Sequence, residues 1–154
     1  MYYSRLELRF LTRGWTGGQL LEGVVAGAVR GVALELASRQ VEYTLVQPKR
    51  GARSHDVVAH SAGTARTVLP AGLVRLTART RVMANTTAVG WVSRIWCDRH
   101  SRELTHLLVQ TRHALLVRSV ERIVEASYLD DLKDGRLTLK LPPADFAGLP
   151  KYRL

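Results

Sequence analysis

The sequence is short of cysteine, of long apolar runs and of acidic residues. Cys97 is the one cysteine among 154 residues, which excludes a framework of internal disulfides. No apolar run reaches the ~18 residues that a membrane-spanning helix needs. Charged residues interrupt every apolar stretch of the N-terminal segment MYYSRLELRFLTRGW, so we expect no signal peptide. These absences predict a soluble, cytoplasmic protein.

The shortage of acidic residues leaves a strongly basic chain. It carries 23 Lys and Arg residues against 13 Asp and Glu residues, a formal net charge of +10. The excess is dispersed, mostly as arginine, whose planar guanidinium suits phosphate and carboxylate groups. An anionic partner is therefore expected: RNA, an anionic membrane surface or an acidic protein face. Arginine enrichment from a GC-rich genome, with a solvated surface, is the alternative.

Apolar residues recur mainly at every second position, the period of a half-buried β-strand. The segment RLTLKL, Arg136–Leu141, alternates in this way, and short strands separated by turns favour an all-β barrel or sandwich. VERIVEASYLDDL is the one longer segment that a helix could claim, and PPADFAGLP could start a single helical turn. We expect an all-β fold with at most one or two short helical turns. The clearest strand pairs are Val29–Leu36 with Val41–Gln47 and Val89–Cys97 with Leu104–Gln110.

The chain contains an internal repeat. AVRGVALELASRQ followed by VEYTLVQ, from Ala28, is similar to AVGWVSRIWCDRHSRELTHLLVQ, from Ala88, when a short gap is allowed in the turn. Two copies of a small β unit can share a core that neither buries well alone. We expect an N-terminal arm over residues 1–22, a degenerate unit over 23–75 and a better-formed unit over 76–154.

The second unit carries TRVMANTTAVGWVSRIWCDRHSRELTHLLVQ, then ERIVEASYLDDLKDGRLTLKL and a terminal LP. In this pattern it resembles the PRC-barrel family. The resemblance implies two tandem, small, strongly bent β-barrels that share an interface. Family members include the C-terminal domain of a ribosome-maturation factor and the cytoplasmic part of the photosynthetic reaction-centre H subunit. Both dock to other macromolecules, and the family has no shared catalytic motif, so the resemblance transfers no functional residue.

The stretch VSRIWCDRHSRELTHLLV concentrates side chains that can bind a metal or take part in catalysis. If its two strands pair around the turn DRHSRE, Cys97 lies opposite Leu104 and Ile95 lies opposite His106. Cross-strand partners share a face, which makes Cys97 and His106 diagonal neighbours. Two ligands fall short of the three of a catalytic zinc site and the four of a structural one. We expect no metal and a buried, unreactive Cys97.

Catalytic chemistry finds no better support in the sequence. Cys97, His106 and Glu103 could form a Cys–His–acid set, but nothing indicates an oxyanion hole or a helix N-terminus that would activate the thiol. Asp130 and Asp131 lie beside a glycine-containing turn, and this setting favours an exposed turn over a general-acid pair. The glycine-rich segments match no phosphate-binding loop. We expect no catalytic residue and no cofactor.

Trp91 and Trp96 are separated by an odd number of positions, so along a regular strand they face opposite sides. Arg94 shares its side with Trp96, and such an Arg–Trp pair is typical of a protein interface or a base-stacking platform. The alternative is a tryptophan covered by the sister unit. The sequence leaves open whether the arginines of the second unit, including Arg79, Arg81 and Arg122, gather at one end. The candidate contact surface is Arg94, Trp96, Arg99, Arg102, Arg112 and Arg118.

These observations predict a non-catalytic binding module that docks to a protein or ribonucleoprotein assembly. A small, rigid β scaffold presents a pre-organised surface at little entropic cost. Two alternatives stay open: an RNA- or ribosome-associated factor that binds through its arginines, and a protein that docks at an anionic membrane surface. The identity of the partner and the oligomeric state are not determined by the sequence.

Overall fold

The computed structural model describes residues 19–22, 25–48, 58–61, 64–66, 68–98, 100–111 and 120–152. These residues form twelve strands, one turn of 3-10 helix (η1, Ala126–Tyr128) and one short α-helix (α2, Pro143–Gly148). The predicted all-β class is therefore confirmed. The segment VERIVEASYLDDL forms a strand, η1 and a second strand. The helix α2 begins at Pro143, and the fixed φ of proline suits this first helical position.

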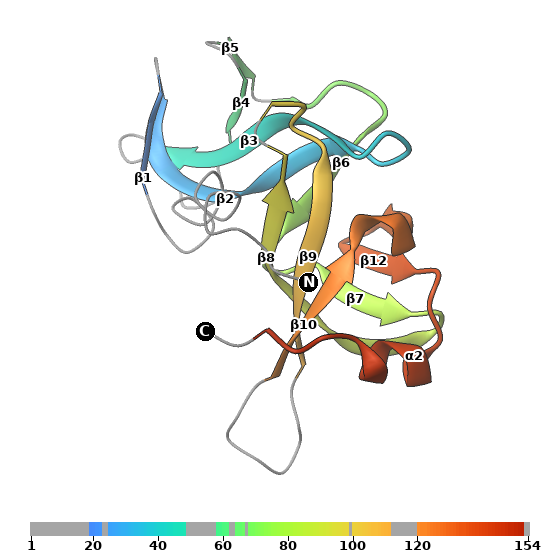
Figure 1. Ribbon diagram of the computed structural model, residues 1–154. Helices are drawn as coiled ribbons and strands as arrows, with labels where there is room; N and C mark the ends of the chain where they lie inside the picture. The colour runs from blue at the N-terminus through green and yellow to red at the C-terminus, as the bar shows by residue number, and fades with distance from the viewer. Residues whose placement is uncertain are drawn as a thin grey trace.

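The first sheet takes its strands from residues 19–77, which run from blue to green in Figure 1. Its order is β1-β2-β3-β4-β5, and β6 also pairs with β2. The predicted division between residues 75 and 76 lies inside β6, and β1 lies within the predicted N-terminal arm. The strands are β1 (Gln19–Glu22), β2 (Val25–Glu35), β3 (Gln40–Pro48), β4 (Val58–Ser61), β5 (Thr64–Arg66) and β6 (Leu73–Thr77).

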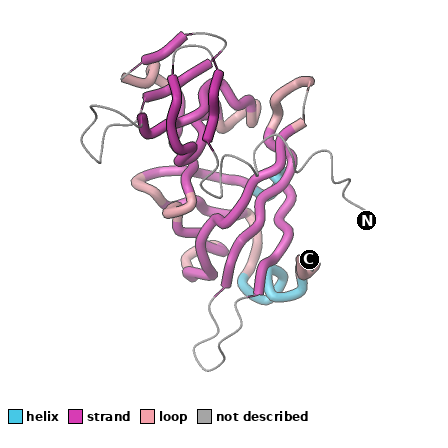
Figure 2. The backbone as a smooth tube through the Cα atoms, turned by 90° about the vertical axis from the view of Figure 1, so that its left-hand side faces the viewer, coloured by secondary structure: helices cyan, strands magenta, loops and turns pink. Residues whose placement is uncertain are grey.

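The second sheet has the order β10-β9-β8-β7-β12-β11, with β12 parallel to β7 and every other neighbouring pair antiparallel. Figure 2 shows the two sheets as two groups of strands, one above the other. Among the described residues no ladder joins β10 to β11, so a closed tandem barrel stays a prediction. The strands are β7 (Arg81–Ala84), β8 (Thr87–Cys97), β9 (Leu104–Thr111), β10 (Val120–Glu125), β11 (Leu129–Lys133) and β12 (Arg136–Leu139).

The β2–β3 and β8–β9 hairpins have the same strand pairing. Each pair in the β8–β9 register matches a pair in the β2–β3 register when 63 is subtracted from both residue numbers, as Cys97 with Leu104 matches Leu34 with Val41. The bulges match as well. Arg30 of β2 and Ser93 of β8 are equivalent extra residues, and so are Glu42 of β3 and Thr105 of β9. The offset is the same on both sides of the turns. The gap that the sequence comparison placed in the turn is therefore wrong.

The turns of these two hairpins bind each other. The Val41 N–H donates to the Arg102 carbonyl at 3.1 Å, and the Leu104 N–H donates to the Arg39 carbonyl at 2.9 Å. Val41 and Leu104 differ by 63, and so do Arg39 and Arg102, so exchanging the two hairpins converts each bond into the other. The contact therefore has approximate twofold symmetry, like an isologous dimer interface. In Figure 1, β8 and β9 extend upward from the second sheet to the β2–β3 hairpin.

The two sheets share one hydrophobic core. Val32, Leu34 and Leu76 of the first sheet, all 0% exposed, belong to the same cluster as the inward-facing residues of the second sheet. RLTLKL contributes as its alternation predicts, since Leu137 and Leu139 are buried in this cluster. A small separate cluster lies on the outer face of each sheet, and the two are matched by the offset of 63. They contain Ala33 and Leu45 in the first sheet and Trp96 and Leu108 in the second.

Candidate functional site: the outer face of the second sheet

The β8–β9 register decides whether Cys97 and His106 can act together. Cys97 pairs with Leu104, as predicted, but His106 pairs with Trp96 and not with Ile95. The difference comes from the bulge at Thr105, which adds one residue to β9 and moves its later side chains to the opposite face. Cys97 therefore lies in the shared core, whereas His106 packs edge-on against Trp96 on the outer face, with ring centroids 6.0 Å apart.

The surroundings of Cys97 keep its thiol protonated. Burial raises its pKa to about 12, against a smaller lowering by the Arg102 guanidinium. The thiolate is the reactive form, so Cys97 is a poor nucleophile at neutral pH. Glu103, the acid of the hypothetical catalytic set, instead forms an ion pair with Arg39 at 2.8 Å. The three side chains that the sequence brought together are thus directed to three different environments.

The turn after β8 is held by its aspartate. The Asp98 carboxylate accepts hydrogen bonds from the His100 and Ser101 backbone N–H groups at 2.8 and 2.7 Å. These bonds, led by the one from Ser101, lower the pKa of Asp98. Asp98 thus caps its own turn, as is common for aspartate. Within the described part of the chain, no group of three or more His, Cys, Asp or Glu residues could hold a metal ion.

The predicted contact residues lie in different environments in the structure. Arg94 is half-buried and lies with its guanidinium 5.8 Å from the centre of the Tyr152 ring, and its role as a contact residue stays a prediction. Arg102 lies in the β8–β9 turn, where its main chain binds the first sheet. Trp96 is only 2% exposed, so its prediction as a surface contact residue is wrong. Arg99, Arg112 and Arg118 lie outside the described residues.

Among the described residues, Trp96 is covered by the C-terminal segment, residues 150–152. This segment runs along β10: the Ile123 N–H donates to the Pro150 carbonyl, and the Tyr152 N–H donates to the Glu121 carbonyl, both at 2.9 Å. The pairing brings the Tyr152 ring to 5.9 Å from the Trp96 ring. It also occupies the edge of β10, which would otherwise present unpaired backbone groups. Arg94, Tyr152 and Trp96 therefore form a packed stack in place of an open contact site.

An open row of polar and aromatic residues lies beside this stack. The register pairs Gln110 with Trp91, Trp91 with Arg81, and Arg81 with Arg136, across β9, β8, β7 and β12. Each member precedes or follows a core residue; Val92, Val109, Val82 and Leu137 are at most 1% exposed. Because side chains alternate along a strand, the row lies on the face away from the core. We call Gln110, Trp91, Arg81 and Arg136 the cross-strand row.

The cross-strand row carries positive charge around an indole ring. The Arg81 guanidinium lies 5.9 Å from the centre of the Trp91 ring, within cation–π range. Trp91 is half-buried, and Arg81, Gln110 and Arg136 are exposed. Among the described residues, no carboxylate forms an ion pair with Arg81 or Arg136. Their charges are therefore not neutralised within this part of the chain.

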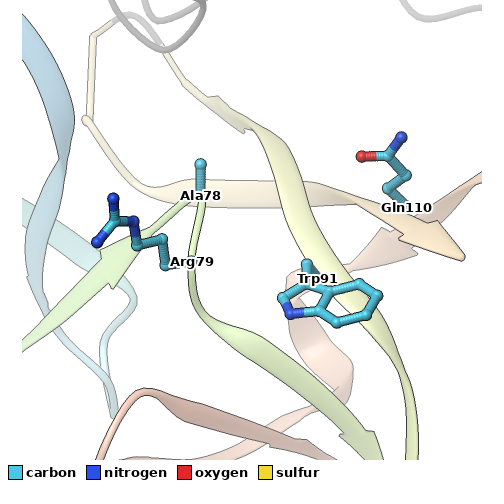
Figure 3. A pocket seen from close by; sticks show the side chains of 4 residues that line it. All are labelled: Ala78, Arg79, Trp91 and Gln110. Carbon is cyan, nitrogen blue, oxygen red and sulfur yellow. The ribbon is translucent and has the colours of Figure 1, made fainter. Parts of the chain in front are cut away.

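A pocket opens at the end of the cross-strand row and is lined by Ala78, Arg79, Trp91 and Gln110, as Figure 3 shows. Arg79 lies in the turn between β6 and β7, where its N–H donates to the Thr77 hydroxyl at 3.2 Å. A second arginine, Arg79, thus lines the same pocket as Trp91. The strand register alone would not predict this, because Arg79 lies outside the strands. The sequence suggested Arg79 and Arg81 as members of a possible arginine cluster. No sequence pattern indicated that they lie near Gln110 and Arg136.

Comparison with protein-family models yields no match, and comparison with curated proteins yields no significant relative. The resemblance to the PRC-barrel family therefore stays a prediction. Within the described residues, no helix has the length and apolar character required to cross a membrane.

Proposed function

We propose that this chain is a non-catalytic binding module that docks to a protein or ribonucleoprotein assembly through the outer face of its second sheet. The observation that carries the proposal is the cross-strand row, in which an indole lies between an amide and two arginines on paired strands. Arginine and tryptophan are the residue types that most often dominate the energy of a binding surface. Their strands are held by a shared core, so little conformational entropy is lost when a partner binds.

The surroundings of Cys97 support the non-catalytic part of the proposal. Its thiol is buried on one face of the hairpin, and the histidine that would serve as its base lies on the other. The arginines of the cross-strand row instead suit an anionic surface. Long-range attraction between a protein of net charge +10 and such a surface would speed association.

The test is affinity purification of the tagged full chain from a cell extract, compared with a variant in which Arg79, Arg81 and Arg136 are changed to glutamine. We expect the partners captured by the wild-type chain to be lost from this variant. Arg75→Gln is the control for loss of an arginine elsewhere on the surface, because Arg75 is exposed on β6 of the first sheet. An unchanged set of partners in the triple variant would contradict the proposal.

Catalysis is tested separately with a Cys97→Ala, His106→Ala variant. A binding module retains its partners after both substitutions, provided that circular dichroism shows an intact β fold. Loss of the cellular phenotype together with full retention of the partners would argue for a reaction at these residues.

A further inference from the structure

The geometry of the cross-strand row points to single-stranded RNA as its ligand. We propose that a base stacks on the exposed part of Trp91 while Arg79, Arg81 and Arg136 hold neighbouring phosphates. This inference rests on the proposed binding function and names the partner class at the same surface. Aromatic side chains on a sheet, flanked by cations, are a general way to bind single strands, since every base has a π face and every nucleotide a phosphate.

The dimensions of the cross-strand row suit an extended strand. Neighbouring strands lie about 4.8 Å apart, so the row from Gln110 to Arg136 spans roughly 14 Å across four strands. Trp91 lies between the amide of Gln110 and the guanidinium of Arg81. The amide can donate to and accept from the edge of a base, while the guanidinium groups donate only, as phosphate recognition requires.

The backbone beside Trp91 is closely packed, which holds the platform in place. A Cβ atom on Gly90 would overlap the carbonyl oxygen of Gln110, so β8 and β9 approach more closely here than a side chain allows. Trp91 and Gln110 are thereby kept in a fixed relation on adjacent strands. A fixed platform favours stacking, because binding then orders few protein groups.

RNA fits this surface better than a protein or a membrane does. Protein interfaces usually have an apolar centre, and membrane-binding surfaces insert apolar side chains. Among the described residues, Val68 is the one exposed large hydrophobic residue, and it lies in the loop before β6, outside the cross-strand row. What the row offers is positive charge, one half-buried ring and an amide, which together match phosphates and bases.

The test measures binding of the full chain to a fluorescent, mixed-sequence single-stranded RNA of about 10 nucleotides, within the usual site sizes of such surfaces. Alanine substitution removes the ring on which a base would stack, so Trp91→Ala is expected to weaken binding roughly 5- to 150-fold. Trp91→Phe should retain most of the affinity because a ring remains. The same RNA annealed to its complement should bind more weakly, because its bases are stacked inside a duplex.

The arginines are tested through the salt dependence of the same binding. Each phosphate contact to a single strand contributes about 0.7 to the slope of log affinity against log salt concentration. Arg79→Gln combined with Arg81→Gln should therefore lower this slope by about 1.4. Arg75→Gln, which removes one positive charge from the first sheet, should leave the slope within error of the wild type.

Three results would overturn the inference. The first is RNA binding that is unchanged by Trp91→Ala and by the paired arginine variant. The second is no RNA binding at low salt by a folded wild-type chain. If, in the second case, affinity purification still captures protein partners that the triple arginine variant loses, the inference about RNA fails while the proposed docking function stands. Vesicles of anionic phospholipid that compete with the RNA but bind Trp91→Ala as tightly as wild type would likewise assign the surface to membranes.

Discussion

Arg39 and Arg102 occupy equivalent positions in the two hairpin turns, and each accepts a backbone hydrogen bond from the other hairpin. Both have left-handed backbone conformations, with φ of 60° and 59°. Such a conformation is uncommon for a residue with a side chain. Here it lets each turn direct its carbonyl outward to the opposite strand. The two halves of the chain are thereby joined by backbone groups as well as by their shared core.

The first prediction concerns the ion pair across this contact. The Arg39 and Glu103 side chains are 36% and 39% exposed, so water screens their attraction. A double-mutant cycle with Arg39→Gln and Glu103→Gln should give a coupling free energy of roughly 0.2–1 kcal/mol from chemical denaturation, and salt should reduce it. Lys140 and Asp130 form a longer, more exposed pair at 3.6 Å and serve as the control. A larger coupling in the control pair would contradict the expectation.

The second prediction concerns the stability of the protein at high pH. The pKa of Cys97 is raised from 9.0 to about 12 in the folded state, so the unfolded chain loses this proton first as pH rises. Below pH 9 both states are protonated, and between pH 9 and about 12 the unfolded state binds fewer protons, so the folded state loses stability. The limiting slope for one group is about 1.4 kcal/mol per pH unit.

Urea denaturation of wild type and Cys97→Ala at a series of pH values measures this effect. The unfolding free energy of the variant should fall less steeply above pH 9 than that of the wild type. Iodoacetamide should modify Cys97 slowly in the native protein and rapidly in denaturant. Equal slopes in the two proteins, or rapid alkylation of the native thiol, would show that the thiol is not buried.

The third prediction concerns the cover over Trp96. Tyr152→Ala removes the ring that lies against Trp96, so water should reach the indole and its fluorescence should shift to longer wavelength. The cost in unfolding free energy should be roughly 1–2 kcal/mol, less than the loss of a fully buried aromatic ring, because Tyr152 is half-buried. The measurement uses a background with Trp15 and Trp91 changed to phenylalanine.

Tyr152→Phe is the matched control for the cover, because it keeps the ring against Trp96. It should leave the emission maximum near that of the parent. An unshifted maximum in Tyr152→Ala would mean that something other than the C-terminal segment shields Trp96.

The fourth prediction uses two glycines with opposite surroundings. Gly90→Ala places a Cβ against the Gln110 carbonyl oxygen, so the strands must separate, and overpacking of this kind commonly costs about 1–3 kcal/mol. Gly148→Ala meets nothing within 4 Å and should leave the melting temperature nearly unchanged. Thermal denaturation of the two variants under identical conditions gives the comparison. Equal melting temperatures would show that β8 and β9 do not approach as closely as described.

Local patterns were enough to predict several elements. Period-two alternation placed RLTLKL as a strand with its leucines inward, and the similarity of two segments indicated the repeated hairpin, although with a gap in the turn that the register does not contain. The pairing of Cys97 with Leu104 also followed from the turn. These features depend on neighbours within one hairpin, where side-chain alternation and turn length set the geometry.

The same reasoning failed where a single residue changed the count. A bulge at Thr105 reverses the faces that follow it, which no alternation pattern signals, and so His106 was placed with Ile95 instead of Trp96. The cross-strand row has a related difficulty, because its members come from β7, β8, β9 and β12. These residues are aligned across the sheet by the ladders and bulges between their strands. The number of residues that separates them in the sequence does not predict this alignment.

The sequence by itself determined that this chain is built of strands, that it contains a repeated hairpin and that it is basic, because periodicity, internal similarity and charge can be read from residues in order. Only the tertiary structure decided that Cys97 and His106 lie on opposite faces, that Tyr152 covers Trp96 and that Trp91 stands among arginines. Each of these depends on register and on contacts between distant segments. Such contacts form because the two halves bury one core together, and that burial fixes which face of each strand meets water.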